Sequence, residues 1–292
     1  MRNIYICLVF AIFSSVSLKA QHSCCAPASA ASSTQKFAAF ASDVKFGAAH
    51  ETPKPLALDS LRGEMVTFAT VSGEGRAYFL KTPKASSKVV FVFHEYWGLN
   101  DYIKREAQRI QKDLGDVTVY AIDLYDGKIA TTAEDAGKFM QAVKEDRARA
   151  IIEGAIAKAG SEAKIATIGW CFGGGWALQA AIMAGSQTQG CIIYYGMPET
   201  DVAVLKTLQA PVVGHFASKD AWITPAIVAD FKKNMKAAGK KLTVHMYNAD
   251  HAFANPSNPK YNKSLSAQAY KKSIAFFKEV FKRKRPVPAK KK

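Results

Sequence analysis

The chain has 292 residues, of which 49% are hydrophobic and 22% are charged. This length and composition allow one sizeable hydrophobic core and exclude a protein that is disordered, fibrous or membrane-spanning as a whole. The formal net charge of +16 is unevenly distributed. Nine of the 40 basic residues lie in residues 1–20 and 282–292, which hold no acidic residue, so residues 21–281 carry 31 basic and 24 acidic residues, a net charge of +7.

The first 20 residues have the composition of a secretory signal peptide. Arg2 is followed by an apolar run over residues 4–13 and by a small and polar stretch that ends at Ala20. The apolar run is too short to cross a bilayer, and no later run of about 20 apolar residues exists, so we expect no stable membrane insertion. The sequence predicts an exported protein, periplasmic or secreted, that is cleaved near Ala20. A retained N-terminal anchor is the alternative.

Residues 21–62 are expected to form an N-terminal lead-in that is partly flexible, because its first part is rich in Ala and Ser. Cys24 and Cys25 lie there, and exposed thiols or a metal site are the alternatives for this pair. Cys191 lies in an apolar run and is predicted to be a buried, unreactive thiol. Five cysteines are too few for a disulfide scaffold, and no cysteine spacing indicates zinc, so we expect neither a metal nor another cofactor.

Residues 63–281 have the pattern of an α/β domain, in which short β-branched or aromatic runs alternate with longer helical patterns. The predicted strands are 64–71, 75–80, 88–94, 117–122, 163–168, 190–195, 211–217 and 241–247. The predicted helices are 100–114, 131–159, 173–185, 223–238 and 263–282.

The strands at 88–94 and 163–168 are almost continuously apolar, which predicts a central position in a mostly parallel sheet of about eight strands with helices on both faces. Ligands of such sheets bind beyond the carboxyl ends of the strands. We therefore expect the chemistry in the loops that follow His94, Ile168, Phe216 and Tyr247.

The sequence GWCFGGG at residues 169–175 joins a predicted strand to a predicted helix. Cys171 would lie at the apex of a sharp, strained turn, where glycines on both sides avoid collisions with the backbone. The following helix N-terminus favours a thiolate over a thiol. This pattern indicates a nucleophilic cysteine, and a glycine-rich turn with a buried cysteine is the alternative.

A catalytic cysteine requires a general base and an acid that orients the base. Asp220 and His251 each follow a predicted strand, and the order Cys, Asp, His is the order found in α/β-hydrolases. The three residues therefore form a candidate catalytic triad.

Other acids and histidines are predicted to have structural roles. Asp123 ends a strand and is expected to cap a turn, and Asp250 is expected to point away from its neighbour in sequence, the candidate base. His215 and His245 lie inside predicted strands, where a satisfied core or surface histidine is the ordinary case. His50 lies in the lead-in.

The motifs HEYWGLN (94–100), DLY (123–125), GWCFGGG (169–175) and ADHAFA (249–254) resemble those of dienelactone hydrolases, in the same order. With the Asp220 loop, the resemblance covers about residues 63–281. It implies an α/β-hydrolase fold and a hydrolase that cleaves a small ester or lactone through a thioester.

The resemblance also implies a role for individual residues. Cys171 would be the nucleophile, His251 the base and acid, and Asp220 the residue that orients His251. The backbone N–H groups of Phe172 and Tyr96 would form the oxyanion hole. Glu95 would contact the resting thiol and help to activate it when substrate binds.

One position departs from the family pattern. Dienelactone hydrolases hold the substrate carboxylate with an arginine where this chain has Asn255. The region of a second family arginine offers Lys128 and Lys138 here, before any arginine, the first of which is Arg147. We expect substrate contacts from Asn255, Trp97 and Lys128, with weak discrimination in favour of anionic lactones.

Two alternatives to a dienelactone hydrolase remain. The first is an exported esterase or thioesterase for neutral substrates, and the second is a non-catalytic binding protein with this fold. The basic tail at 282–292 has no aromatic residue to stack on bases, so we expect no nucleic-acid partner.

Overall fold

The computed structural model of this protein describes residues 31–56 and 61–283. The predicted signal at 1–20, the Cys24 and Cys25 pair and most of the basic tail lie outside the described residues. In the described ranges, no helix combines the length and the apolar character that crossing a membrane would require.

Within the described part of the chain, eight strands form one sheet in the order β1-β2-β4-β3-β5-β6-β7-β8. β2 pairs antiparallel with both β1 and β4, and all other neighbours are parallel. The central position predicted for β3 and β5 is confirmed, and each of these strands is buried at every residue after its first. The strands are β1 Glu64–Thr70, β2 Gly73–Leu80, β3 Lys88–Phe93, β4 Thr118–Asp123, β5 Lys164–Trp170, β6 Thr188–Tyr194, β7 Val212–Ala217 and β8 Leu242–Tyr247.

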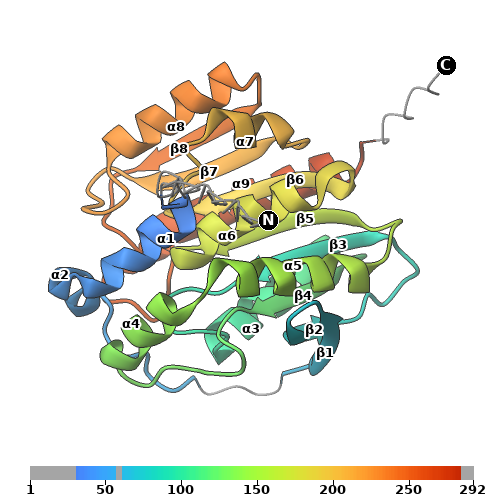
Figure 1. Cartoon of the computed structure of the whole chain (residues 1–292), viewed down its shortest axis with the longest axis horizontal. Helices are drawn as coiled ribbons and strands as arrows, with labels where there is room; N and C mark the ends of the chain where they lie inside the picture. The colour runs from blue at the N-terminus through green and yellow to red at the C-terminus, as the bar shows by residue number, and fades with distance from the viewer. Residues whose placement is uncertain (1–30, 57–60, 284–292) are drawn as a thin grey trace, which may run out of the picture. The chain divides into compact units, whose positions relative to one another are not determined.

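Helices cover both faces of the sheet, as the sequence predicts (Figure 1). α3 and α9 pack against each other and against strands on one face, whereas α5 and α6 pack together on the other, with α7 and α8 beside them. The helical segments are α1 Ser33–Ala38, η1 Ala39–Ser42, α2 Val44–Ala48, α3 Asp101–Leu114, α4 Ala133–Ala142, α5 Glu145–Ala159, α6 Phe172–Met183, η2 Gly185–Gln187, α7 Val202–Thr207, α8 Pro225–Ala237 and α9 Lys263–Val280.

The single helix predicted at 131–159 is wrong, because the structure has two helices there, α4 and α5. Val143 lies between them with an extended backbone (ψ 106°). Glu145 and Asp146 then occupy the first turn of α5, where negative charge interacts favourably with the helix dipole. Residues 138–148 contain neither Gly nor Pro, so no ordinary helix breaker marks this boundary.

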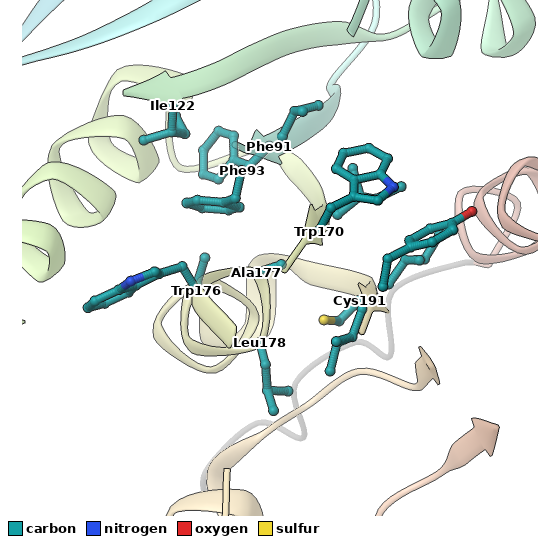
Figure 2. Close-up of a cluster of buried hydrophobic side chains, with 14 of the residues drawn as sticks. Phe91, Phe93, Ile122, Trp170, Trp176, Ala177, Leu178 and Cys191 are labelled. Carbon is teal, nitrogen blue, oxygen red and sulfur yellow. The ribbon is translucent and has the colours of Figure 1, made fainter. Parts of the chain in front are cut away.

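The hydrophobic core surrounds α6, whose residues 172–181 are all buried. α6 packs against β3, β5 and β6. Figure 2 shows part of this cluster, with Phe93 of β3 and with Trp176 and Ala177 of α6. This packing fixes the start of α6, which directly follows Cys171 in the chain.

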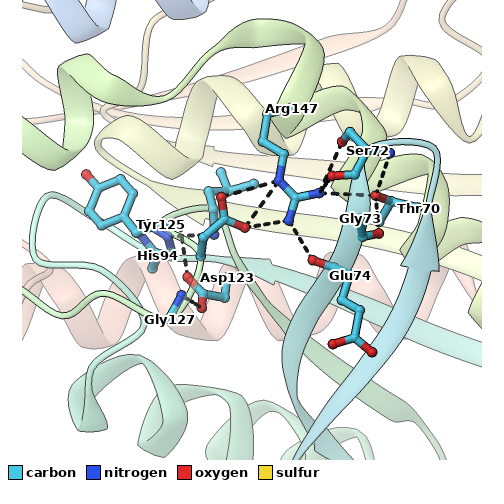
Figure 3. Close-up of polar contacts among 11 residues, drawn as sticks. Thr70, Ser72, Gly73, Glu74, His94, Asp123, Tyr125, Gly127 and Arg147 are labelled. Carbon is cyan, nitrogen blue, oxygen red and sulfur yellow. Dashed lines mark hydrogen bonds and ion pairs between the residues drawn. The ribbon is translucent and has the colours of Figure 1, made fainter.

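Arg147 on α5 holds the β1–β2 hairpin in place (Figure 3). Its guanidinium donates hydrogen bonds to the carboxylate of Asp126, to the hydroxyls of Thr70 and Ser72 and to the backbone oxygen of Glu74. The donors of Arg147 are committed to these partners, which gives this residue a structural role.

α1, η1 and α2 lie in the N-terminal lead-in, where the sequence predicted no helix. We refer to residues 33–50 as the N-terminal cap. α1 lies beside α6 (Figure 1). Asp43 of the cap accepts a hydrogen bond of 3.0 Å from the indole of Trp222, and Ala49 accepts one of 2.9 Å from the amide of Asn258. The cap is therefore bonded to the loops that follow β7 and β8.

Candidate active site

Cys171 lies at the turn between β5 and α6 with φ 55° and ψ −122°, the strained backbone that the sequence predicts. A Cβ atom on Gly169 would collide with the backbone of Gly173, and a Cβ on Gly173 would lie 2.5 Å from the backbone oxygen of Phe93. Only glycine fits at these two positions. The turn thus places the Cys171 side chain at the carboxyl end of a central strand, and its thiol is fully buried.

Cys171, His251 and Asp220 form one hydrogen-bonded chain of side chains. Nε2 of His251 lies 3.4 Å from Sγ of Cys171, and Nδ1 of His251 lies 2.7 Å from Oδ2 of Asp220. Asp220 also accepts hydrogen bonds of 2.9 Å from the N–H groups of Trp222 and Ile223. These bonds fix the carboxylate, which in turn fixes the orientation of the imidazole.

The electrostatics of these three buried groups make His251 a good proton acceptor. Burial opposes ionisation of Asp220, but His251 and two backbone N–H groups hold the pKa of Asp220 below its usual value. Burial also opposes protonation of His251, yet Asp220 and the Cys171 sulfur raise the pKa of His251 well above its usual value. Burial raises the pKa of the Cys171 thiol, and His251 opposes that rise. Asp220 is therefore ionised, and it stabilises the imidazolium that forms when His251 accepts a proton.

Among the described residues, neither of the two backbone N–H groups expected to form an oxyanion hole is used within a helix or a strand. Phe172 is the first residue of α6, so its N–H has no acceptor within the helix and instead donates to the Cys171 sulfur. Tyr96 lies in the loop after β3, and in the described ranges its N–H donates to no other residue. The Tyr96 hydroxyl donates to the backbone oxygen of Ala133 at 2.6 Å, which anchors the residue.

Glu95 is bonded differently from the expectation. Its carboxylate accepts a hydrogen bond of 2.7 Å from the amide of Asn255 and one of 3.3 Å from the hydroxyl of Tyr195. Among the described residues, no hydrogen bond joins Glu95 to the Cys171 thiol. Burial raises the pKa of Glu95 to about 7, and the bonds from Asn255 and Tyr195 oppose that rise.

Asn255 and Trp97 line one cavity with Glu95, but Lys128 does not. Trp97 is buried and borders this cavity together with Arg105 and Trp170. The Asn255 amide nitrogen already donates one of its two hydrogens to Glu95, so only the other is left for a substrate.

Lys128 is exposed and lies over the ring of Phe139, 5.4 Å from its centre, where it lines a separate cavity. The prediction that Lys128 lies at the substrate site is therefore not supported by its position. The sequence could not place it, because a loop lysine has no pattern that fixes where its side chain points.

His50 is the residue of this site that the sequence did not indicate. Its Nε2 lies 3.8 Å from Sγ of Cys171, and its Nδ1 lies 2.7 Å from the backbone oxygen of Phe46. Burial, with a smaller contribution from His251, lowers the pKa of His50 to about 3, so the ring is neutral. His50 is 121 residues from Cys171 in sequence, in a segment predicted to be partly flexible.

Two of the structural roles predicted from the sequence are confirmed. Asp123 accepts hydrogen bonds from the N–H groups of Tyr125 and Gly127 and so caps the turn after β4 (Figure 3). His215 is buried between the hydroxyls of Tyr247 and Ser273.

Cys191 is buried, and burial raises the pKa of its thiol to about 12. Cys191 therefore stays protonated at neutral pH, as expected for a buried cysteine with a structural role.

Comparisons with known proteins agree with this geometry. The sequence profile of the dienelactone hydrolase family matches residues 76–281. A putative carboxymethylenebutenolidase of Aquifex aeolicus is 28% identical over 234 residues, which cover 75% of this chain and 100% of that protein. Carboxymethylenebutenolidase 1 of Cupriavidus pinatubonensis is 26% identical over 218 residues, which cover 69% of this chain and 90% of that protein.

Solved structures share the fold. A putative dienelactone hydrolase from Klebsiella pneumoniae superposes with a TM-score of 0.64 at 19% identity, over 76% of this chain and 100% of that one. The triad geometry, the family match and the shared α/β-hydrolase architecture lead to one conclusion. This chain belongs to the dienelactone hydrolase family, and it is a carboxylic ester hydrolase.

Proposed function

We propose that the enzyme cleaves small carboxylic esters or lactones by using Cys171 as a nucleophile. The observation that supports this proposal is the hydrogen-bonded chain from Cys171 through His251 to Asp220, with distances of 3.4 and 2.7 Å, at a turn with φ 55°. A buried cysteine that served only packing would need neither the strained backbone nor an oriented imidazole.

The proposed reaction begins when the Cys171 sulfur attacks the carbonyl carbon and its proton passes to His251. The N–H groups of Phe172 and Tyr96 donate hydrogen bonds to the developing oxyanion. As the C–O bond to the leaving group breaks, His251 protonates the departing oxygen and a thioester remains. His251 then takes a proton from water, the hydroxide attacks the thioester, and the thiolate leaves with the acid released.

Access to the thiol requires a change in the N-terminal cap. Cys171 is fully buried, and Phe46 of the cap is buried 6.0 Å from the His251 ring. Part of the cap must therefore move away before the carbonyl of an ester can reach the sulfur. We propose that the cap, held to the loops by the Asp43 and Ala49 hydrogen bonds, limits the substrates to small molecules.

The test is turnover of p-nitrophenyl acetate by the wild type and by Cys171→Ala. Loss of a nucleophile typically lowers the rate on the order of a millionfold, so the variant should have no measurable activity while its circular dichroism spectrum is unchanged. Activity in the variant above about a tenth of the wild type would contradict the assignment of Cys171.

We also propose that the enzyme acts outside the cytoplasm. The order of Arg2, the apolar run 4–13 and the small-residue stretch to Ala20 supports export. N-terminal sequencing of protein from its native host should find a chain that starts within a few residues of position 21. A chain that begins at Met1 or Arg2 would contradict export with cleavage.

A further inference from the structure

Two histidines from distant parts of the chain face the same sulfur atom. Nε2 of His251 and Nε2 of His50 lie 3.4 and 3.8 Å from Sγ of Cys171, and all three atoms lie within 4.8 Å of one another. The mechanism proposed above uses His251 and leaves His50 without a role. A catalytic thiol needs only one imidazole, so the second requires its own explanation.

Each of the two rings is anchored through its other nitrogen. Nδ1 of His50 faces the backbone oxygen of Phe46 at 2.7 Å, and Nδ1 of His251 faces the Asp220 carboxylate at 2.7 Å. Since a carbonyl or carboxylate oxygen only accepts hydrogen bonds, both Nδ1 atoms carry hydrogen. Metal-binding histidines are typically held in this way, by a carbonyl or carboxylate behind the ring, with the remaining nitrogen directed at the ion.

The separations fit a tetrahedral metal. With metal–sulfur bonds of about 2.3 Å and metal–nitrogen bonds of about 2.0 Å, tetrahedral ligands place sulfur and nitrogen about 3.5 Å apart. The observed distances of 3.4 and 3.8 Å bracket that value. The two nitrogens lie within 4.8 Å of each other, and tetrahedral ligands place two nitrogens about 3.3 Å apart.

We propose that Cys171, His251 and His50 form a binding site for a thiophilic divalent cation, and that Zn²⁺ is the occupant. One thiolate and two imidazoles are ligands that zinc prefers, and three protein ligands leave a fourth position for water. On binding, the Cys171 thiol releases its proton to solvent and the sulfur electron pair is shared with the ion. The ion engages the Cys171 sulfur and the His251 Nε2 together, so the nucleophile and its base and acid are both withdrawn and the hydrolase is held inactive.

This inference shares Cys171 and His251 with the proposed function but is tested by a different signal. Co²⁺, which takes the place of Zn²⁺ in such sites, gives a sulfur-to-cobalt charge-transfer band when a thiolate is bound, whether or not the protein hydrolyses esters. The full chain is used with Cys7→Ser, Cys24→Ser and Cys25→Ser, because any of these thiols that bound cobalt would give the same band. This triple variant is the parent for all comparisons.

Titration of the parent with CoCl₂ should produce the charge-transfer band together with the visible bands of tetrahedral cobalt, and ZnCl₂ should abolish both. Cys171→Ser should remove the charge-transfer band. His50→Gln should weaken zinc binding by more than the roughly 10–100-fold that loss of an outer partner costs. His245→Gln is the matched control, since His245 stacks on His215 at 5.3 Å outside the cluster, and it should bind as tightly as the parent.

X-ray absorption of the zinc-loaded parent keeps the test independent of how well the His50 variant folds. One sulfur at about 2.3 Å and imidazole scattering from two histidines are expected. A zinc environment without sulfur, cobalt binding that survives Cys171→Ser unchanged, or equal affinities of the parent and a folded His50→Gln variant would overturn the proposal. None of these outcomes alters the turnover test of Cys171, so failure of the metal site and failure of the proposed function are distinguishable.

Discussion

The amide of Asn255 donates a hydrogen bond of 2.7 Å to the carboxylate of Glu95. Both side chains are buried, and each occupies a position that the family resemblance associates with the substrate or the resting thiol. Each of the two side chains is therefore a hydrogen-bond partner of the other. This bond affects which substrates the enzyme prefers and how the stability of the protein depends on pH.

The first prediction is that the enzyme discriminates weakly in favour of anionic substrates. Asn255 already donates to Glu95, and Arg105, a cation that lines the same cavity, is exposed. An exposed ion pair contributes about 0–1 kcal/mol, or up to about fivefold in kcat/KM. A neutral ester and its carboxylate-bearing analogue should therefore differ by less than about tenfold, and Arg105→Gln should change their ratio by no more than about fivefold. A preference above about 100-fold for the anion that Arg105→Gln removes would contradict this.

The second prediction concerns Glu95 and pH. Burial raises the pKa of Glu95 from 4.5 to about 7, so between these values the unfolded chain releases a proton that the folded chain retains. The free energy of unfolding therefore falls as pH rises through this window, by on the order of 3 kcal/mol. Glu95→Gln should melt at a higher temperature than the wild type at pH 8, and the difference should shrink towards pH 4.5.

The control for this measurement is Glu153→Gln, at an exposed position on α5. It should leave the melting temperature close to that of the wild type across the range. A Glu95→Gln variant whose advantage does not depend on pH would show that Glu95 is ionised in the folded protein at all these values.

The third prediction separates Asp220 from its alternative. Asp220 lies 2.7 Å from Nδ1 of His251, whereas Asp250 makes no hydrogen bond to that histidine among the residues described. Asp220→Asn should lower kcat by a factor on the order of 10³ to 10⁴, because the imidazole loses its orientation and its charge partner. Asp250→Asn should leave kcat within a factor of a few. The reverse pattern in steady-state kinetics would mean that Asp250 is the acid.

The sequence was informative where local motifs fix the backbone. The central position of β3 and β5 followed from their apolar runs, and the turn around Cys171 followed from glycines that only a strained turn requires. The loops after β5, β7 and β8 then bring Cys171, Asp220 and His251 together, because the carboxyl ends of parallel strands meet at one edge of a sheet.

The N-terminal cap and His50 could not be predicted in the same way. Their position depends on contacts with loops more than 100 residues away, such as those between Asp43 and Trp222 and between Ala49 and Asn258. The sequence does contain a local signal for a helix start, because Ser32 and Gln35 form a capping box at the start of α1. It predicts a short helix but not what that helix covers.

The fourth prediction is that the cap is an integral part of the folded domain. Phe46 is fully buried, with ring centres 4.4 Å from His50 and 5.1 Å from Trp222. Phe46→Ala should lower the free energy of unfolding by about 3–5 kcal/mol in urea titrations. Val44→Ala, at a position on the same helix that is 85% exposed, should change it by less than about 0.5 kcal/mol. Equal stabilities of the two variants would place the cap outside the cooperative unit.

The most direct test of the central claim is to trap the acyl-enzyme. The protein is mixed with p-nitrophenyl acetate, quenched in acid within the first turnover, digested and analysed by mass spectrometry. If Cys171 is the nucleophile, a single acetyl group should be found on the peptide that contains Cys171, and Cys171→Ala should show neither that adduct nor a burst of p-nitrophenol. A full burst without acetyl on Cys171, or an adduct on another residue that turns over at the rate of catalysis, would contradict the account.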